Sequence, residues 1–424
     1  GGLFGCAPQQ AAAAEAHETM DYDVVVLGGG GAGVTAAGQA AAAGAKTVLV
    51  EKMAWLAGSS SLAIGTLYGA GTKLQKEAGI EDTPEGLLEY FLSRGGDKLD
   101  YDVQKFCAEH FGETIDWLYE DLKVPFKETV SKKGKDPVPR GHNCSNNAMD
   151  YLRAVTAYAQ EQGAEFHFGT TVESLVVDEG GAVTGVLAKR GNGSTVLYNA
   201  KNVIVATGGF CRNADMIDEY MPDYSGVYTE VGVGCTGEGL RMGLDIGADY
   251  VGHGGTNGIL ACPVEPGQSK LISNKALWIN SKGERFANES GPYDYILNAA
   301  LTQPHHTVVD IWDSDYETYL EQFDIHGCAR VYPFENGAPT NMTLETVKGI
   351  NEGLLAEGYI VKADTIEELA KGLGIPAENL KKTVERQNEN YDNQVDPDFG
   401  KEAFRLSPVR KAPFYGVRTS GYML

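Results

Sequence analysis

The chain has 424 residues, which is enough for two or three average domains and for a large buried core. Lys and Arg total 35 against 58 for Asp and Glu, so the formal net charge is −23, which argues against nucleic acid or an anionic membrane surface as a partner. The 54 glycines make up about 13% of the chain against a usual value of roughly 7%, and their aperiodic placement excludes collagen, while only 16 prolines argue against disorder.

The first 20 residues have the character of a leader and tether rather than of a folded domain. Residues 3–6 read Leu-Phe-Gly-Cys, which resembles the lipobox of exported bacterial lipoproteins. On this interpretation Cys6 carries a lipid anchor, residues 7–20 form a flexible tether, and the protein works on the extracytoplasmic face of the cell envelope. The alternative is an incidental cysteine in a disordered leader.

The segment from residue 21 to residue 51 predicts a strand, a glycine turn, a helix and a second strand. Residues 21–27 (DYDVVVL) and 46–51 (KTVLVE) are apolar and β-branched, and the small residues 34–43 suit a helix. The turn follows G-x-G-x-x-G, which lets a diphosphate approach the backbone at a helix N-terminus, and an acid at the end of the second strand can bind ribose hydroxyls. The alternative is a structural glycine turn, and the choice between NAD and FAD stays open at this point. The predicted cofactor contacts here are Gly28, Gly30, Gly31, Ala32, Gly33, Glu51 and Lys52.

Residues 57–72 (AGSSSLAIGTLYGAGT) form a second segment of small residues directly after this acid. Here the chain resembles the flavoproteins of the fumarate reductase, succinate dehydrogenase and 3-ketosteroid dehydrogenase superfamily, and the resemblance implies FAD as the cofactor. In that family two turns wrap the diphosphate and the flavin ring. Ser59 stands where the family has Asn, and Thr66 where it has a second Gly. The positions that match the two turns are Gly58, Ser59, Ser60, Ile64 and Gly65.

Three later segments match the same family. Residues 171–177 and 183–189 predict a β-hairpin, and residues 201–210 (KNVIVATGGF) predict a buried strand that ends in the family's Ala-Thr-Gly-Gly turn. Residues 234–248 match the family pattern T-G-D/E-G-x-x-x-A/G. The resemblance therefore adds these FAD contacts: Val172 with its backbone at the adenine, Ala206, Thr207, Gly208, and Glu238 at the flavin end.

The resemblance also implies the architecture. We expect an α/β fold with a Rossmann-like FAD-binding domain at residues 21–252 and an inserted α+β capping domain, which carries the substrate side, at residues 253–424. In the family a further segment returns to the FAD-binding domain. We expect this return segment to be missing here, since the sequence ends at Leu424, where the segment would begin.

The motif G-E-R-F-A-N-E at residues 283–289 marks the capping domain in this family. We interpret Arg285 and Glu289, which are four residues apart, as a structural ion pair. Four residues beyond Glu289, where fumarate reductases have a proton-donating arginine, this chain has Tyr293, which resembles the urocanate reductase branch. A phenol is protonated at neutral pH, so Tyr293 is a candidate catalytic proton donor; the alternative is one of 21 tyrosines that merely packs.

Other parts of a dicarboxylate clamp are absent from the sequence. The family's His-Pro-Thr is replaced by the region around Asn257 and Gly258, and its Thr-Glu pair by Gln268 and Ser269. We therefore expect the substrate to be neither fumarate nor succinate. An α,β-unsaturated acid with one carboxylate, such as an aryl-acrylate, or an enone suits these residues better.

These features predict an FAD-dependent oxidoreductase that acts on CH–CH groups in anaerobic respiration. It would reduce an activated C=C bond with a hydride from flavin N5 and a proton from Tyr293. The sequence has no motif for nicotinamide, haem or a metal, so we expect electrons from a separate cytochrome or FMN protein. The alternatives are a ketosteroid-type dehydrogenase and, from another class, a non-catalytic flavin-binding subunit or fragment.

Overall fold

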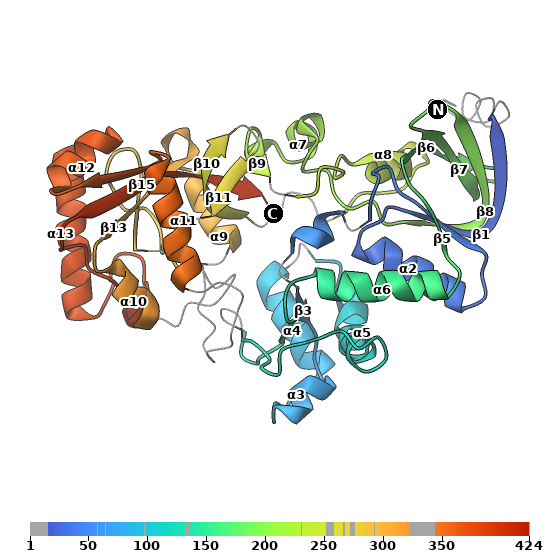
Figure 1. The fold of residues 1–424 in the computed structure, drawn as a ribbon, viewed down its shortest axis with the longest axis horizontal. Coiled ribbons are helices and arrows are strands. Elements are labelled where there is room, and N and C mark those ends of the chain that lie inside the picture. The colour runs from blue at the N-terminus through green and yellow to red at the C-terminus, as the bar shows by residue number, and fades with distance from the viewer. Residues whose placement is uncertain are drawn as a thin grey trace. The chain divides into compact units, whose positions relative to one another are not determined.

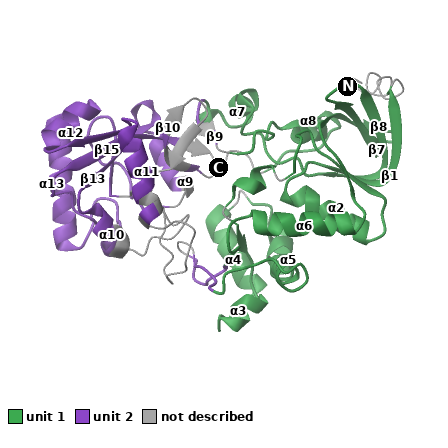
Figure 2. Cartoon of the chain, viewed as in Figure 1, with its two compact units in different colours: residues 1–128, 142–225, 231–254 green, residues 129–141, 226–230, 255–424 purple. Residues whose placement is uncertain are grey.

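The computed structural model describes residues 16–423 apart from 57, 64, 97–98, 133–135, 230, 252–257, 266–267, 272–275, 292 and 323–343. The leader with Cys6 and the predicted contact Ile64 thus lie outside the described residues. Among the described helices, none is both long and apolar enough to cross a membrane. The chain divides into two compact units (Figure 2): Gly1–Glu128, His142–Ser225 and Val231–Gly254 form the first, and Thr129–Gly141, Gly226–Glu230 and Gly255–Leu424 form the second.

The first unit contains the expected strand, turn, helix and strand at its start (Figure 1). Its elements are β1 (Glu18–Leu27), α2 (Gly31–Ala42), β2 (Thr47–Val50), η1 (Gly58–Leu62), β3 (Thr66–Tyr68), α3 (Lys73–Glu77), α4 (Pro84–Gly95), α5 (Tyr101–Glu120), β4 (Gly141–Asn143), which begins in the second unit, α6 (Met149–Glu161), β5 (Glu165–His167), β6 (Thr170–Val177), β7 (Val183–Arg190), β8 (Thr195–Val205), α7 (Ala214–Tyr220), η3 (Pro222–Tyr224) and α8 (Glu238–Asp245).

A six-stranded sheet forms the centre of the first unit, in the order β5-β2-β1-β8-β7-β6. Strands β5, β2, β1 and β8 are parallel, whereas β7 pairs antiparallel with both β8 and β6. Side chains of β1 alternate between two buried faces: Val25 and Leu27 pack with β6, β7 and α8, and Val26 packs with α2, α5 and α6. Burial on both faces explains the uninterrupted apolar run of this strand.

The predicted hairpin is confirmed by the pairing of β6 with β7, but the predicted strand after it needs a correction. Strand β8 begins at Thr195, earlier than expected, and its last residues are not buried, since 37% of Ile204 and 46% of Val205 are exposed. The reason lies in the pairing: β7 accompanies β8 only up to Asn199, and beyond this residue β8 has β1 alone beside it.

The second unit is built on a seven-stranded sheet. Its elements are β9 (Tyr228–Thr229), β10 (Gly258–Glu265), β11 (Gln268–Leu271), β12 (Leu277–Ile279), α9 (Tyr293–Leu301), η4 (Pro304–His306), β13 (Thr307–Asp313), α10 (Tyr316–Gln322), α11 (Leu344–Ala356), β14 (Ile360–Ala363), α12 (Ile366–Leu373), α13 (Ala377–Asn393), η6 (Ala403–Arg405) and β15 (Phe414–Met423). The order is β11-β10-β15-β13-β12, with β14 and β9 also paired to β15. The last described strand therefore holds this sheet together.

Helices α12 and α13 cover part of this second sheet. Helix α12 begins at a Thr365 cap, whose hydroxyl accepts a hydrogen bond from the Glu368 amide, and it turns Leu369 and Leu373 inward. These leucines pack with apolar residues of β12, β13 and α13 in one core cluster. The first unit has the Rossmann-like α/β arrangement that the sequence predicts, and the second unit has the α+β composition expected of the cap.

Candidate functional site

A cavity of about 570 Å³ lies in the first unit, at the carboxyl ends of β1, β2 and β8. We name it the glycine-loop cavity. Its size is within the usual range for small-molecule and cofactor sites, roughly 300–1,000 Å³. It is lined by Leu27–Ala32, Val50–Met53, Trp55, Gly58–Leu62, Thr170–Val172, Ala206–Gly208, Arg212, Val231–Cys235, Glu238 and Met242.

Two positions of the glycine turn at the start of α2 have no room for a side chain. Gly28 has a positive φ of 101°, and a Cβ there would lie 2.5 Å from the carbonyl oxygen of Ala206. A Cβ at Gly33 would lie 1.9 Å from the carbonyl oxygen of Gly28. Helix α2 begins after Gly30, which has no side chain that could cap the helix N-terminus. The backbone amides of this N-terminus therefore face the cavity, which residues 30–32 line. This arrangement suits an anionic group.

Glu51, the predicted ribose ligand, first of all holds the loop itself. One carboxylate oxygen accepts a hydrogen bond from the Gly29 amide at 2.6 Å, and the other accepts from the Met53 amide at 2.7 Å. These two bonds tie the end of β2 to the glycine loop. A carboxylate has about four lone-pair sites, so these bonds leave acceptor capacity toward the cavity.

The serine turn at residues 58–60 joins two walls of the cavity. The Ser60 hydroxyl accepts a hydrogen bond from the Gly31 amide at 3.1 Å. The Ser59 hydroxyl accepts from the Gly232 amide at 2.9 Å, and its oxygen lies 2.9 Å from the Cys235 sulfur. Ser59, which replaces the family's Asn, thus anchors the segment 231–235 that forms the opposite wall.

Lys52 and Glu238 form an ion pair across the cavity wall. The Lys52 ammonium donates to a Glu238 carboxylate oxygen at 2.8 Å and to the Thr236 hydroxyl at 2.5 Å. Burial alone would raise the pKa of Glu238, but the hydrogen bonds from Lys52 and Thr236 hold it below its ordinary value. Glu238 thus lies on the cavity wall beside Lys52, and its expected place at the flavin end of the cofactor stays a prediction.

The structure brings most of the predicted contact residues together. Those that line the glycine-loop cavity are Gly28, Gly30, Gly31, Ala32, Glu51, Lys52, Gly58, Ser59, Ser60, Val172, Ala206, Thr207, Gly208 and Glu238. Gly33 lies behind the loop and packs on Gly28, and Gly65 packs on residues 147–148, where a Cβ would lie 2.7 Å from the Ala148 nitrogen. Ile64 lies outside the described residues, and Tyr293 opens α9 in the second unit.

Several lining residues had escaped the sequence reasoning. The wall segment 231–235 directly precedes the recognised T-G-E-G pattern, so its neighbourhood was the available signal. Trp55 lies between two recognised turns, and 60% of its side chain is exposed. Arg212 lies in none of the recognised motifs. It reaches the cavity because its guanidinium is held by the carbonyl oxygen of Val231.

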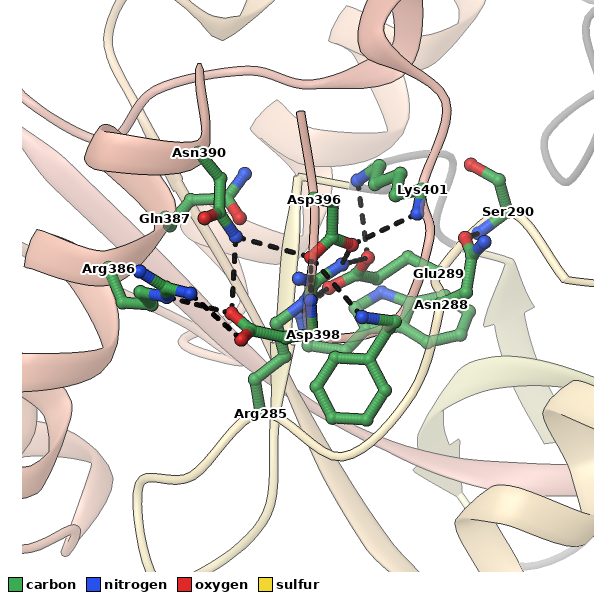
Figure 3. Close-up of polar contacts among 12 residues, drawn as sticks. Arg285, Asn288, Glu289, Ser290, Arg386, Gln387, Asn390, Asp396, Asp398 and Lys401 are labelled. Atoms are coloured by element: carbon green, nitrogen blue, oxygen red, sulfur yellow. Dashed lines mark hydrogen bonds and ion pairs between the residues drawn. The ribbon is translucent and has the colours of Figure 1, made fainter. Parts of the chain in front are cut away.

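The G-E-R-F-A-N-E motif forms the core of a separate polar network in the second unit (Figure 3). The predicted ion pair is confirmed: Nε and Nη2 of Arg285 each donate to a different carboxylate oxygen of Glu289 at 2.8 Å. Asp396 accepts a further hydrogen bond from Arg285 at 2.8 Å, and the ammonium of Lys401 lies 3.3 Å from Glu289. We name Arg285, Glu289, Asp396 and Lys401 the buried charge cluster, since all four side chains are at most 8% exposed.

The four charges of this cluster balance one another. Burial alone would raise the pKa of Glu289, but Lys401 and Arg285 hold it below its ordinary value. For Lys401 burial is the stronger influence, and it lowers the pKa of the ammonium in spite of Glu289. Glu289 also accepts a hydrogen bond from the Trp278 amide, so the cluster ties the end of this motif to β12.

The glycine-loop cavity fits FAD in the chemistry of its walls. Backbone amides at the start of α2 and the cradle around Gly28, which a Cβ would fill, suit a diphosphate. Glu51 offers a carboxylate for ribose hydroxyls, and Val172 brings backbone from β6. Apolar side chains such as Trp55 and Met242 complete the lining for ring systems.

Comparison with known proteins agrees with these features. The chain matches the FAD binding domain family over residues 23–421 and belongs to this family, and its cofactor is FAD. It is 30% identical over 409 residues to urocanate reductase from Eggerthella lenta, with 94% of this chain and 63% of that protein covered. It is 29% identical over 410 residues to vinyl phenol reductase from Lactiplantibacillus plantarum, with 93% and 82% covered. The chain spans 40–66% of the length of three such relatives.

Two solved structures share the fold. The open conformation of a flavocytochrome c3 fumarate reductase has a TM-score of 0.73 at 25% identity, with 100% of this chain and 70% of that chain covered. A 3-ketosteroid-Δ4-(5α)-dehydrogenase from Rhodococcus jostii RHA1, in complex with 4-androstene-3,17-dione, has a TM-score of 0.71 at 26% identity, with 96% and 85% covered. Both belong to the superfamily that the sequence resembles, which confirms that resemblance.

Proposed function

We propose that this chain is the FAD-bearing part of a reductase that acts on an activated C=C bond. The observation that carries the proposal is the glycine-loop cavity, where residues far apart in the sequence meet with the chemistry that FAD requires. Support comes from the relatives, because vinyl phenol and urocanate both contain a C=C bond conjugated to an aromatic ring. Bound FAD, once reduced, supplies the hydride.

Tyr293 is the proton donor in this proposal. It is the first residue of α9, four residues after Glu289 of the buried charge cluster. The cluster holds Glu289 on the backbone of β12, so the motif that precedes the donor is anchored at its last residue. A neutral phenol can deliver its proton to the carbon next to a carbonyl or ring while the neighbouring carbon receives the hydride.

The substrate class follows from the residues that replace a dicarboxylate clamp. Tyr293 stands where an arginine would bind a carboxylate, and Gln268 and Ser269 replace a Thr-Glu pair. The chain also carries a net charge of −23, which disfavours a dianionic substrate. We propose an unsaturated compound with one carboxylate or a ketone, conjugated to an aromatic ring, with electrons from a separate cytochrome or FMN protein.

A second candidate is a dehydrogenase of a cyclic ketone. The specific observation in its favour is the fold shared with the 3-ketosteroid-Δ4-(5α)-dehydrogenase. The two functions predict opposite reactions: the reductase reoxidises reduced flavin with an unsaturated acceptor, whereas the dehydrogenase reduces oxidised flavin with a saturated ketone.

The test uses the purified flavoprotein under anaerobic conditions. The flavin is reduced with dithionite, and its reoxidation is followed by absorbance after addition of aryl-acrylates, vinyl phenols, enones and ketosteroids. Tyr293→Phe should lower the reoxidation rate about 10²- to 10⁴-fold with FAD retained. Tyr101→Phe, at the exposed first residue of α5 in the first unit, is the matched control and should keep the rate. If no acceptor reoxidises the flavin, the reductase proposal is wrong.

A further inference from the structure

The glycine-loop cavity is lined by two cationic side chains among the residues that the structure describes, Lys52 and Arg212. They differ in what they are bound to. Lys52 is neutralised by Glu238, with 2.8 Å between the ammonium nitrogen and the carboxylate oxygen. Arg212 has no carboxylate partner in the described part of the chain. The unneutralised positive charge of the cavity is therefore that of Arg212.

Arg212 is held in place by a neutral contact. Its Nε and Nη2 atoms donate to the carbonyl oxygen of Val231 at 3.0 and 2.9 Å, and its backbone amide donates to the carbonyl oxygen of Cys235 at 2.9 Å. A guanidinium has five N–H donors, so the two bonds to Val231 leave three N–H groups for another acceptor. The charged guanidinium is thus held in place by two of its own N–H groups, which lowers the entropy lost when the others bind an anion.

The other anion-binding groups of the cavity are partly occupied by the protein itself. The Gly31 amide at the start of α2 donates to the Ser60 hydroxyl, and the Gly29 amide donates to Glu51. A ligand with two negative charges would therefore gain from a side-chain cation in the same wall. In a chain with a net charge of −23, such a local cation also offsets long-range repulsion of an anionic ligand.

We propose that Arg212 binds the diphosphate of FAD and sets the affinity of the protein for the cofactor. The binding is a charge-assisted hydrogen bond from the free N–H groups of the guanidinium. Arg212 lies outside every cofactor motif that the sequence displays, so the proposal adds a binding residue that those motifs do not contain.

The experiment measures the dissociation constants of FAD and ADP by titration calorimetry on the protein freed of flavin. ADP carries the diphosphate without the flavin. Arg212→Gln should raise both constants about 10- to 100-fold, since it removes charged hydrogen bonds to the same group. Arg212→Lys keeps the cation but loses the bidentate contact with Val231, so its loss should be clearly smaller than that of Arg212→Gln. Arg241→Gln, an exposed α8 arginine outside the lining, removes the same charge and should leave both constants unchanged.

Three outcomes would overturn the proposal. An unchanged ADP constant for Arg212→Gln would show that the side chain does not meet the diphosphate. An equal loss for Arg212→Lys would show that the Val231 contact, rather than the charge, matters. An equal loss for Arg241→Gln would reduce the effect to net charge. Arg212→Ala replaces Arg212→Gln in the same comparison if the latter does not fold, as judged by thermal unfolding without ligand.

Discussion

The glycine-loop cavity and the buried charge cluster use charged residues in opposite ways. In the cluster, two cations and two carboxylates pair with one another and are almost completely shielded from water. In the cavity, one cation is paired at a half-exposed position, another has no carboxylate partner in the described chain, and backbone amides face the open space. Charges that satisfy one another hold a fold, whereas groups with remaining hydrogen-bonding capacity are available to a ligand.

Lowering the pH should produce the largest difference in stability between the two regions, because acid protonates both carboxylates of the cluster. Burial alone would raise the pKa values of Glu289 and Asp396, but Arg285 and Lys401 hold them below their ordinary values. A carboxyl group of this kind stabilises the fold fully above its unfolded pKa, near 4, and the stabilisation is lost as the pH falls through the lower folded value. Unfolding by urea at pH 7, 5, 4 and 3 should therefore show falling stability of the second unit below about pH 4.

Tryptophan emission makes this measurement specific to the second unit. The chain has four tryptophans, of which Trp278 and Trp312 are buried in the second unit. Replacing Trp55 and Trp117 by Phe leaves emission from the second unit alone. A stability of this unit that stays constant between pH 5 and pH 3 would contradict the predicted role of the two carboxylates.

Removing a single carboxylate charge should give the next largest effect. Glu289→Gln leaves the buried Lys401 and Arg285 with Asp396 as their remaining carboxylate in the cluster, and breaking a buried pair in this way costs about 3–5 kcal/mol. Urea unfolding at pH 7 provides the free energy. Glu367→Gln, which breaks an exposed pair of 3.6 Å with Lys381, is the control and should change stability by no more than about 0.5 kcal/mol. A comparable loss of unfolding free energy in Glu289→Gln and Glu367→Gln would mean that burial does not make the ion pairs of the cluster stronger than an exposed pair.

A methyl group added at Gly33, which packs against the glycine loop, tests how far the cavity depends on close backbone packing. Gly33→Ala places a Cβ 1.9 Å from the carbonyl oxygen of Gly28, so the loop and α2 must separate. We expect a loss of about 1–3 kcal/mol in the stability of the first unit, as for overpacked cores, and loss of bound FAD. Flavin absorbance after gel filtration measures the retained cofactor. Gly353→Ala in α11, where no atom lies within 4 Å of the added Cβ, should keep FAD and full stability.

The same contrast explains how much of the molecule could be predicted from the sequence. Contacts made by residues close in sequence left a pattern: the strand and glycine turn before α2, the hairpin, and the pair of Arg285 with Glu289. Asp396 joins Arg285 across 111 positions, and no local spacing records such a contact. The exposure of Val205 likewise depends on where a neighbouring strand stops pairing. Backbone motifs are local, whereas side-chain neighbours depend on the completed fold.

Among the cofactor residues, too, the local motifs could be predicted and the side-chain contacts could not, and Glu238 is an example. Its motif predicts a cofactor contact, and Glu238 does line the cavity, whereas its assignment to the flavin end rests on the family resemblance and stays a prediction. The ion pair with Lys52 could not be read from the motif, because the two residues lie 186 positions apart. Arg212 is the opposite case, because its position depends on a carbonyl group 19 residues away and on no motif.

The smallest expected effect is the coupling energy between Lys52 and Glu238. Its size shows whether the two regions differ because their ion pairs differ in exposure to water. The two side chains are 24% and 38% exposed, so water screens their attraction, and the coupling energy should be only about 0.2–1 kcal/mol. A double-mutant cycle of Lys52→Met and Glu238→Gln, followed by urea unfolding without flavin, measures it directly. A coupling above about 2 kcal/mol, approaching the value expected for a buried pair, would mean that this pair holds the fold as the cluster does. A weak coupling would leave Lys52 able to exchange Glu238 for a ligand at little energetic cost, which is the property expected of a cavity that binds and releases a cofactor.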